Sequence, residues 1–213
     1  MLKGSLIELD EFEAAPPNTH RLFWKAAGEA VGTSVDIIPF DGVASKDKTI
    51  VWPPRGDVVM NVAGFEEALE SAVQMRIEGD LVVRVASTPG LAVLKLIAWQ
   101  ARRHENNKDA TDLHWLLAAY ADAGNLDRLY DEELDLLEDA GYDLELAGSE
   151  LLGRDAARIC QHETRRQISA VLSSEQLVDQ LIRQMRQFGF DEEVHVERIS
   201  NLLTRFASGF LGG

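Results

Sequence analysis

The 213 residues carry a formal net charge of −15, and 46% of them are hydrophobic. This composition supports a buried core and excludes wholesale disorder, while the acidic balance argues against general binding to a nucleic-acid backbone, which needs a basic footprint. The sequence has no apolar stretch of about 18 residues, no signal-peptide pattern at its start and a single cysteine, so we expect a cytoplasmic protein in a reducing compartment, without a membrane partner.

The first part of the chain is predicted to consist mainly of short strands. An aromatic-rich stretch at residues 20–24 and an apolar run at residues 35–40 are typical of strands, and the two glycines between them suit a hairpin connection. Residues 41–57 read as a loop. A helix is predicted over 65–75, and residues 76–85 read as two strands about a Gly-Asp turn.

After Pro89 the pattern is helical to the end of the chain. Pro89 suits the first turn of a helix over 91–104, and a clear apolar stripe predicts a second helix over 110–123. Further helices are predicted at 128–140, 143–160, 162–172, 174–188 and 191–208. Strands followed by helices predict an α+β fold, with a sheet domain over 1–88 and a helical domain over 89–213.

Asp36 is the first candidate site residue, because it lies inside the apolar run 35–40. A buried carboxylate is unfavourable unless it is paired or bound to a cation. Strand alternation would place Asp36, Ile38 and Phe40 on one face. The pattern is compatible with a metal ligand or general base facing a cleft. It is also compatible with a strand-end carboxylate in water, or with an ion pair to Arg21.

Lys95 is the second candidate, since it is the one charged residue in the apolar helical run 91–99. An ammonium group in such a helix must find an anion or reach water. Trp99, Arg102 and Arg103 follow at i+4, i+7 and i+8, near the same face. This cationic strip with an aromatic in it suits a triphosphate and a base. The alternative is a buried ion pair.

Asp109 and Asp112 are the third candidate, because they are three residues apart and share a helix face. Asp109 would make a good N-cap, and an acid at Asp112 suits the exposed N–H groups of a first turn. Asp112 also adjoins the buried stripe. It is therefore one of two carboxylates, with Asp36, that we consider as the partner of Lys95.

Other groups give weaker signals. The five histidines show no paired metal-ligand spacing, and Cys160 falls in a helical stretch where a buried apolar role is expected rather than that of a nucleophile. There is no Walker-type loop and no dinucleotide-binding glycine motif. Residues 127–150 carry ten acidic residues and one basic residue, Arg128. This segment is typical of a solvated helical face, and docking to a basic partner is the alternative.

Three motifs, taken in order, resemble a known family. They are Val35-Asp36-Ile37-Ile38-Pro39-Phe40, then Pro89–Trp99, then Lys108-Asp109-Ala110-Thr111-Asp112-Leu113. Their order and spacing are similar to those of the bacterial nucleotidyltransferases related to abortive-infection (AbiE-type) toxins, which have a polymerase-β-like fold. The resemblance spans roughly residues 20–120 and continues through Leu151–Asp155. It implies a partial nucleotidyltransferase mixed β-sheet with flanking helices, followed by a C-terminal helical bundle.

The same resemblance implies site residues and chemistry. Asp36 would be the third metal-binding carboxylate and a catalytic residue, and Lys95, Arg102, Asp109 and Asp112 would bind the nucleotide. The implied reaction transfers a nucleoside monophosphate from an NTP to an acceptor hydroxyl, with Mg²⁺ as the cofactor. An RNA, a protein and a small molecule all remain open as the acceptor, and an antitoxin is the implied partner.

One family feature has no counterpart here. Family members carry a Gly-Ser or Gly-Ala helix start and then an Asp-x-Asp strand upstream of this region, and neither Gly4-Ser5 nor Glu8-Leu9-Asp10 has the right context. Two metal ions about 3.5–4 Å apart cannot be held by one aspartate, so an N-terminally truncated form with little or no activity is expected. An exposed sheet edge would then favour self-association. The alternative is a non-enzymatic or antitoxin-like protein that acts through its acidic helices.

Overall fold

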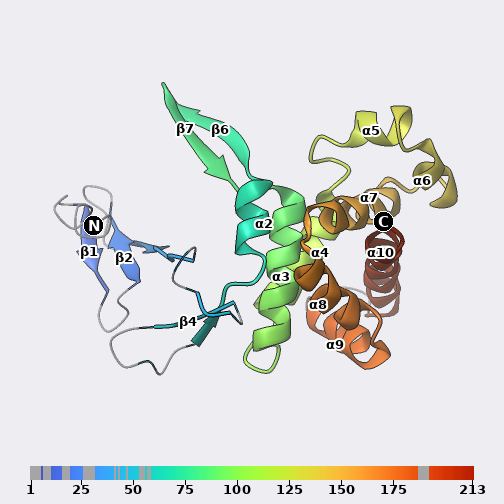
Figure 1. Ribbon diagram of the computed structural model, residues 1–213. Coiled ribbons are helices and arrows are strands. Elements are labelled where there is room, and N and C mark those ends of the chain that lie inside the picture. The colour runs from blue at the N-terminus through green and yellow to red at the C-terminus, as the bar shows by residue number, and fades with distance from the viewer. Residues whose placement is uncertain are drawn as a thin grey trace. The chain divides into compact units, whose positions relative to one another are not determined.

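The structure, a computed structural model, forms two compact units, residues 1–62 and 63–213 (Figure 1). The predicted boundary between residues 88 and 89 lies within the second unit, in the first turn of a helix, and stays a prediction about domain organisation. The motifs at Gly4-Ser5 and Glu8–Asp10, most of the predicted hairpin connection and parts of the loop at 41–57 lie outside the described residues. The described residues are 6, 11–15, 20–25, 32–40, 42, 44–46, 48–52, 56, 59–186 and 192–213.

The strands described in the first unit are short and antiparallel. One sheet has the order β1-β2-β3, and a separate pair joins β4 to β5; these strands are β1 (Phe12–Ala14), β2 (Arg21–Trp24), β3 (Thr33–Asp36), β4 (Thr49–Val51) and β5 (Val59–Asn61). The predicted strand over 35–40 is wrong beyond Asp36, where β3 ends. Ile37 still donates its N–H to the His20 carbonyl, but Pro39 has no N–H with which to extend the ladder.

The second unit begins with a helix, a hairpin and a long helix. These are α2 (Phe65–Glu70), β6 (Val73–Glu78), β7 (Leu81–Val85) and α3 (Thr88–Arg102). The predicted turn at Gly79-Asp80 is confirmed, and Gly79 has a positive φ of 53°, which glycine adopts readily. Ser87 caps α3 by accepting the Gly90 N–H, and Pro89 lies in the first turn as expected.

The other elements of the described chain are helices. They are α4 (Lys108–Ala119), α5 (Leu126–Asp131), α6 (Leu134–Asp139), α7 (Leu144–Ile159), α8 (His162–Leu172), α9 (Glu175–Met185) and α10 (Glu192–Gly212). The stretch predicted as one helix over 128–140 is two short helices. The Arg128 carbonyl accepts the N–H groups of both Glu132 and Glu133, which closes the last turn of α5. The order of strands and then helices confirms the α+β class.

The core of the second unit surrounds α7, which packs against α10, α3 and α4 (Figure 1). Its fully buried side chains include Trp99, Leu113, Leu117, Leu151 and Phe206. Helices α3 and α4 also pack directly on each other. Side chains on their facing turns can therefore contact each other. Among the described residues, no helix is both long enough and apolar enough to cross a bilayer.

Candidate functional site

A cluster of four charged side chains joins α3 to α4. The Lys95 Nζ lies 2.5 Å from Oδ2 of Asp112 and 3.6 Å from Oδ1 of Asp109. The Arg102 Nη2 donates to both oxygens of Asp109, at 3.0 Å and 2.8 Å. The structure therefore brings together the four residues for which nucleotide binding is predicted from the sequence. Their role in binding stays a prediction.

The cluster combines one buried carboxylate with three partly exposed groups. The Asp109 side chain is 6% exposed and contacts both cations, whereas Arg102 is 52% exposed. A buried carboxylate needs such partners, because its desolvation is otherwise uncompensated. The expectation that Asp109 caps α4 is wrong: the cap is Asn107, and Asp109 lies inside the first turn.

Trp99 does not face the cluster as an open aromatic, so this part of the predicted cationic strip is wrong. The residue is 1% exposed, and its indole N–H donates to Oε1 of Gln184 at 2.6 Å. The Gln184 amide in turn donates to the Arg103 carbonyl at 2.7 Å, and the Arg103 guanidinium lies 5.9 Å from the Trp99 ring centroid. Gln184 of α9 therefore contacts the last turn of α3, while Lys95 and Arg102 contact carboxylates of α4.

Asp36, in the first unit, forms the ion pair with Arg21 that its sequence context left open. The two residues face each other across β2 and β3. The Arg21 Nε and Nη2 donate to the two carboxylate oxygens at 2.7 Å and 2.8 Å, and the His20 Nε2 lies 4.0 Å away. The hydrogen bonds from Arg21 hold the pKa of Asp36 below its usual value, although burial opposes them. A cation at Asp36 would therefore share the carboxylate with this guanidinium or compete with it.

No metal centre is formed by the described residues alone. Within those ranges, three or more His, Cys, Asp or Glu side chains do not gather where they could hold an ion. The donors present therefore do not fit the two-metal site that the family resemblance implies. Asp36 as a metal ligand stays a prediction.

A second charged network, around Asp155, was not predicted. The Tyr120 hydroxyl donates to Oδ2 at 2.7 Å, Arg128 donates to both oxygens at 2.8 Å and 3.1 Å, and Arg158 donates to Oδ1 at 2.9 Å. Burial alone would raise the pKa of Asp155, but the hydrogen bonds from Arg128 and Tyr120 outweigh it and hold the pKa below its usual value. The network ties the end of α4 and α5 to α7.

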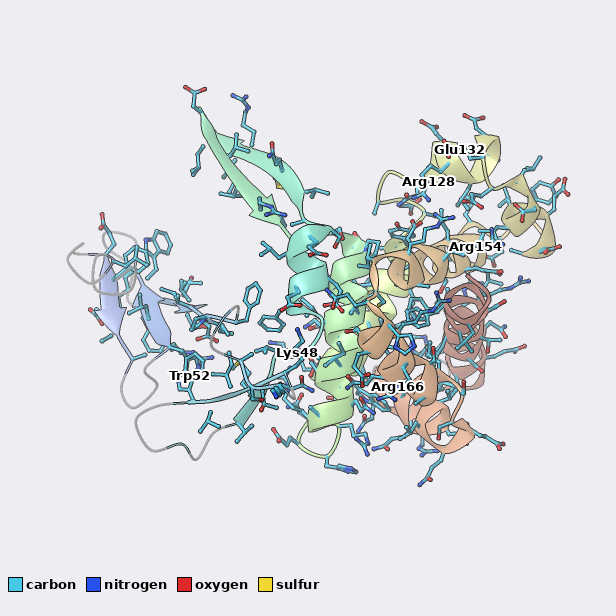
Figure 2. All side chains as sticks on the ribbon, in the orientation of Figure 1. Lys48, Trp52, Arg128, Glu132, Arg154 and Arg166 are labelled. Carbon is cyan, nitrogen blue, oxygen red and sulfur yellow. The ribbon has the colours of Figure 1, made fainter. Side chains whose placement is uncertain are left out.

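Several carboxylates of the acidic segment 127–150 form ion pairs inside the chain. The Arg154 Nη1 lies 2.9 Å from a Glu133 oxygen, and Figure 2 shows Arg154 and Arg128 near the α5–α6 segment. Further pairs are Arg198 with Asp143 and Glu145, and Arg205 with Glu150. These contacts neutralise part of the face that was expected to be solvated. Docking through the acidic helices, the alternative to enzymatic function, stays a prediction.

Comparison with known proteins gives one match. The model of a family described as nucleotidyl transferase AbiEii toxin, type IV TA system, matches residues 15–208. The match covers both units and most of the chain, and it confirms the resemblance that the three motifs indicated. No curated protein and no solved structure matches the chain.

Proposed function

The chain belongs to the AbiEii nucleotidyl transferase toxin family, and from this premise we propose that the α3–α4 cluster binds the triphosphate of a nucleotide substrate. Membership gives a nucleotidyltransferase-like function, with an NTP as substrate and an antitoxin as the implied partner. Transfer of a nucleoside monophosphate to a hydroxyl of an RNA or a protein, and a cytoplasmic location where NTPs are available, are parts of the proposal.

The observation that supports it is the arrangement of two cations about one buried carboxylate. Lys95 and Arg102 lie about two turns apart on one helix, and each contacts Asp109. One fixed carboxylate therefore sets the position of both cations before any ligand arrives. Such preorganisation favours binding, because little side-chain freedom is lost when the ligand is bound.

Exposure determines which contacts a phosphate could take over. Asp112 and Arg102 are partly open to solvent, whereas Asp109 is buried. A triphosphate oxygen can therefore replace Asp112 at the Lys95 ammonium while Asp109 stays in place. In this proposal Asp109 is a positioning residue. Arg102 offers a planar fork to two phosphate oxygens, and Lys95 offers a compact charge.

These cations would also act during the reaction, because phosphoryl transfer depends mainly on positioning and on electrostatic stabilisation of oxygen charge. The family resemblance also implies a divalent metal and Asp36 as one of its ligands, and both are parts of the proposal. The sequence contains no Asp-x-Asp pair, and one aspartate cannot hold two metal ions. We therefore propose little or no transferase activity for these 213 residues by themselves.

Calorimetric titration with inorganic tripolyphosphate tests the binding proposal without requiring activity. The variants are Lys95→Gln and, as the matched control, Arg166→Gln, since Arg166 is an exposed cation of α8 that pairs with Glu163 of the same helix (Figure 2). Charge-assisted hydrogen bonds are worth about 1.5–3 kcal/mol, so Lys95→Gln should weaken binding about tenfold or more. The control should bind like the wild type. Equal affinity of wild type and Lys95→Gln, with circular dichroism showing both folded, would overturn the proposal, as would absence of binding to the wild type.

A further inference from the structure

Trp115 is an aromatic residue of α4 that the core does not use. It is 61% exposed, whereas Leu113 and Leu117 of the same helix are fully buried. Its ring lies 6.5 Å from the ring of His114, tilted by 36°. An indole carries a large apolar surface that gains free energy when another flat apolar group covers it. Trp115 thus presents an open ring face on the helix that carries the cluster.

Helix geometry places Trp115 next to the cluster. Asp109, Asp112 and Trp115 are each three residues apart, and residues at this spacing are neighbours with about 5–6 Å between their Cβ atoms. Side chains on a helix lean toward its N-terminus, so the indole leans toward the turn that contains Asp112. Asp112 in turn holds the Lys95 ammonium. Along α4 the order is therefore Arg102 at Asp109, Lys95 at Asp112, and then an exposed aromatic ring.

We propose that Trp115 is the surface on which the base of the bound nucleotide stacks. Two cations from α3 lie beside the first turns of α4, and the Trp115 ring follows further along α4. A nucleoside triphosphate has the same order of groups, because its anionic phosphates are followed by its aromatic base. Trp99, the aromatic expected for this role from the sequence, is buried and hydrogen-bonded to Gln184. Every base has a π-face, so stacking tolerates all four NTPs. The inference rests on the proposed phosphate site and adds the base end to it.

The test compares ligands with and without a base. Wild type, Trp115→Ala and Trp115→Phe are titrated with ATP, GTP, CTP, UTP and inorganic tripolyphosphate. Tyr130→Ala is the matched control, since Tyr130 is an aromatic of α5 that is also more than half exposed. Loss of base–aromatic stacking should weaken binding of each NTP by Trp115→Ala roughly tenfold, with Trp115→Phe in between. Tripolyphosphate should bind Trp115→Ala as it binds the wild type, and Tyr130→Ala should be unaffected.

The outcomes separate this inference from the function on which it rests. Wild-type NTP affinity in Trp115→Ala would overturn the stacking assignment, while weaker tripolyphosphate binding by Lys95→Gln would leave the phosphate site standing. Equal weakening of NTPs and tripolyphosphate in Trp115→Ala would also overturn it, because the ring would then act on the phosphate end. Unchanged tripolyphosphate binding by Lys95→Gln would overturn the proposed function itself. The exposure of Trp115 makes a folded variant the expectation, and circular dichroism verifies it.

Discussion

Substitution of Gly209 by alanine is expected to disrupt a close contact between α10 and α7. A Cβ atom at Gly209 of α10 would lie 2.1 Å from the Glu150 carbonyl oxygen of α7. The contact is reciprocal, since a Cβ atom at Gly153 of α7 would lie 2.1 Å from the Phe206 carbonyl oxygen. Both obstacles are backbone atoms, so side-chain rotation cannot relieve the clash and the helices must separate.

The expected magnitude follows from two opposing terms. Overpacking costs about 1–3 kcal/mol, and we place this clash near 3 kcal/mol because separation of the helices also loosens the buried rings of Phe206 and Phe210. Alanine recovers about 1 kcal/mol of helix propensity relative to glycine. The net loss is about 2 kcal/mol, which for a chain of this length lowers Tm by about 4–8 °C.

Gly212 supplies the control, because it lies three residues further along α10 and an added Cβ atom there meets nothing within 4 Å. Gly212→Ala should change stability by less than about 0.5 kcal/mol. Thermal unfolding followed by far-UV circular dichroism measures both variants against the wild type. Equal Tm values for Gly209→Ala and Gly212→Ala would refute the reasoning from helix contact.

Two further predictions concern the Tyr120 hydroxyl and the Cys160 thiol. Tyr120→Phe removes the hydroxyl that donates to Asp155 and should lower the free energy of unfolding by about 1.5–3 kcal/mol in urea titrations at neutral pH. The pKa of Asp155 is held below its usual value, so the stability that this carboxylate contributes is present above about pH 4 and is lost as pH falls through its folded-state pKa. The difference in free energy of unfolding between wild type and Tyr120→Phe should therefore become smaller in acid. A difference that stays constant with pH would contradict the assignment. Burial raises the pKa of Cys160 to about 12, so iodoacetamide should label the native protein far more slowly than the urea-unfolded one near neutral pH, as measured by mass spectrometry; comparable rates would contradict this.

Local patterns predicted most of the helices. Pro89 and the apolar run after it indicate α3, and the predicted bounds of α8, 162–172, are those observed. The predicted strand over 35–40 was too long, because the apolar run continues past Asp36, where β3 ends. Pro39 has no N–H with which to pair to a neighbouring strand. Local periodicity also could not show that α5 and α6 are separate, because one carbonyl, that of Arg128, closes the first of them.

The arrangement of the candidate cluster was predicted in part, and its role in binding stays a prediction. A lone ammonium in an apolar helix needs an anion, so the pairing of Lys95 with Asp112 was among the alternatives. The burial of Asp109 was not, because it depends on how α3 and α4 pack. The choice between Trp99 and Trp115 also depends on tertiary structure. The sequence of a helix that is apolar on all sides does not show which face is exposed. Trp99 donates a hydrogen bond to Gln184, which lies 85 residues further along the chain.

We propose that the cations of the α3–α4 cluster bind a triphosphate as a pair. The most direct test of this proposal is the affinity of the Lys95→Gln, Arg102→Gln double variant for inorganic tripolyphosphate, beside the two single variants. Each single variant should lose affinity about tenfold or more, and the double variant should lose more. A folded double variant that binds tripolyphosphate as tightly as the wild type would contradict the proposal.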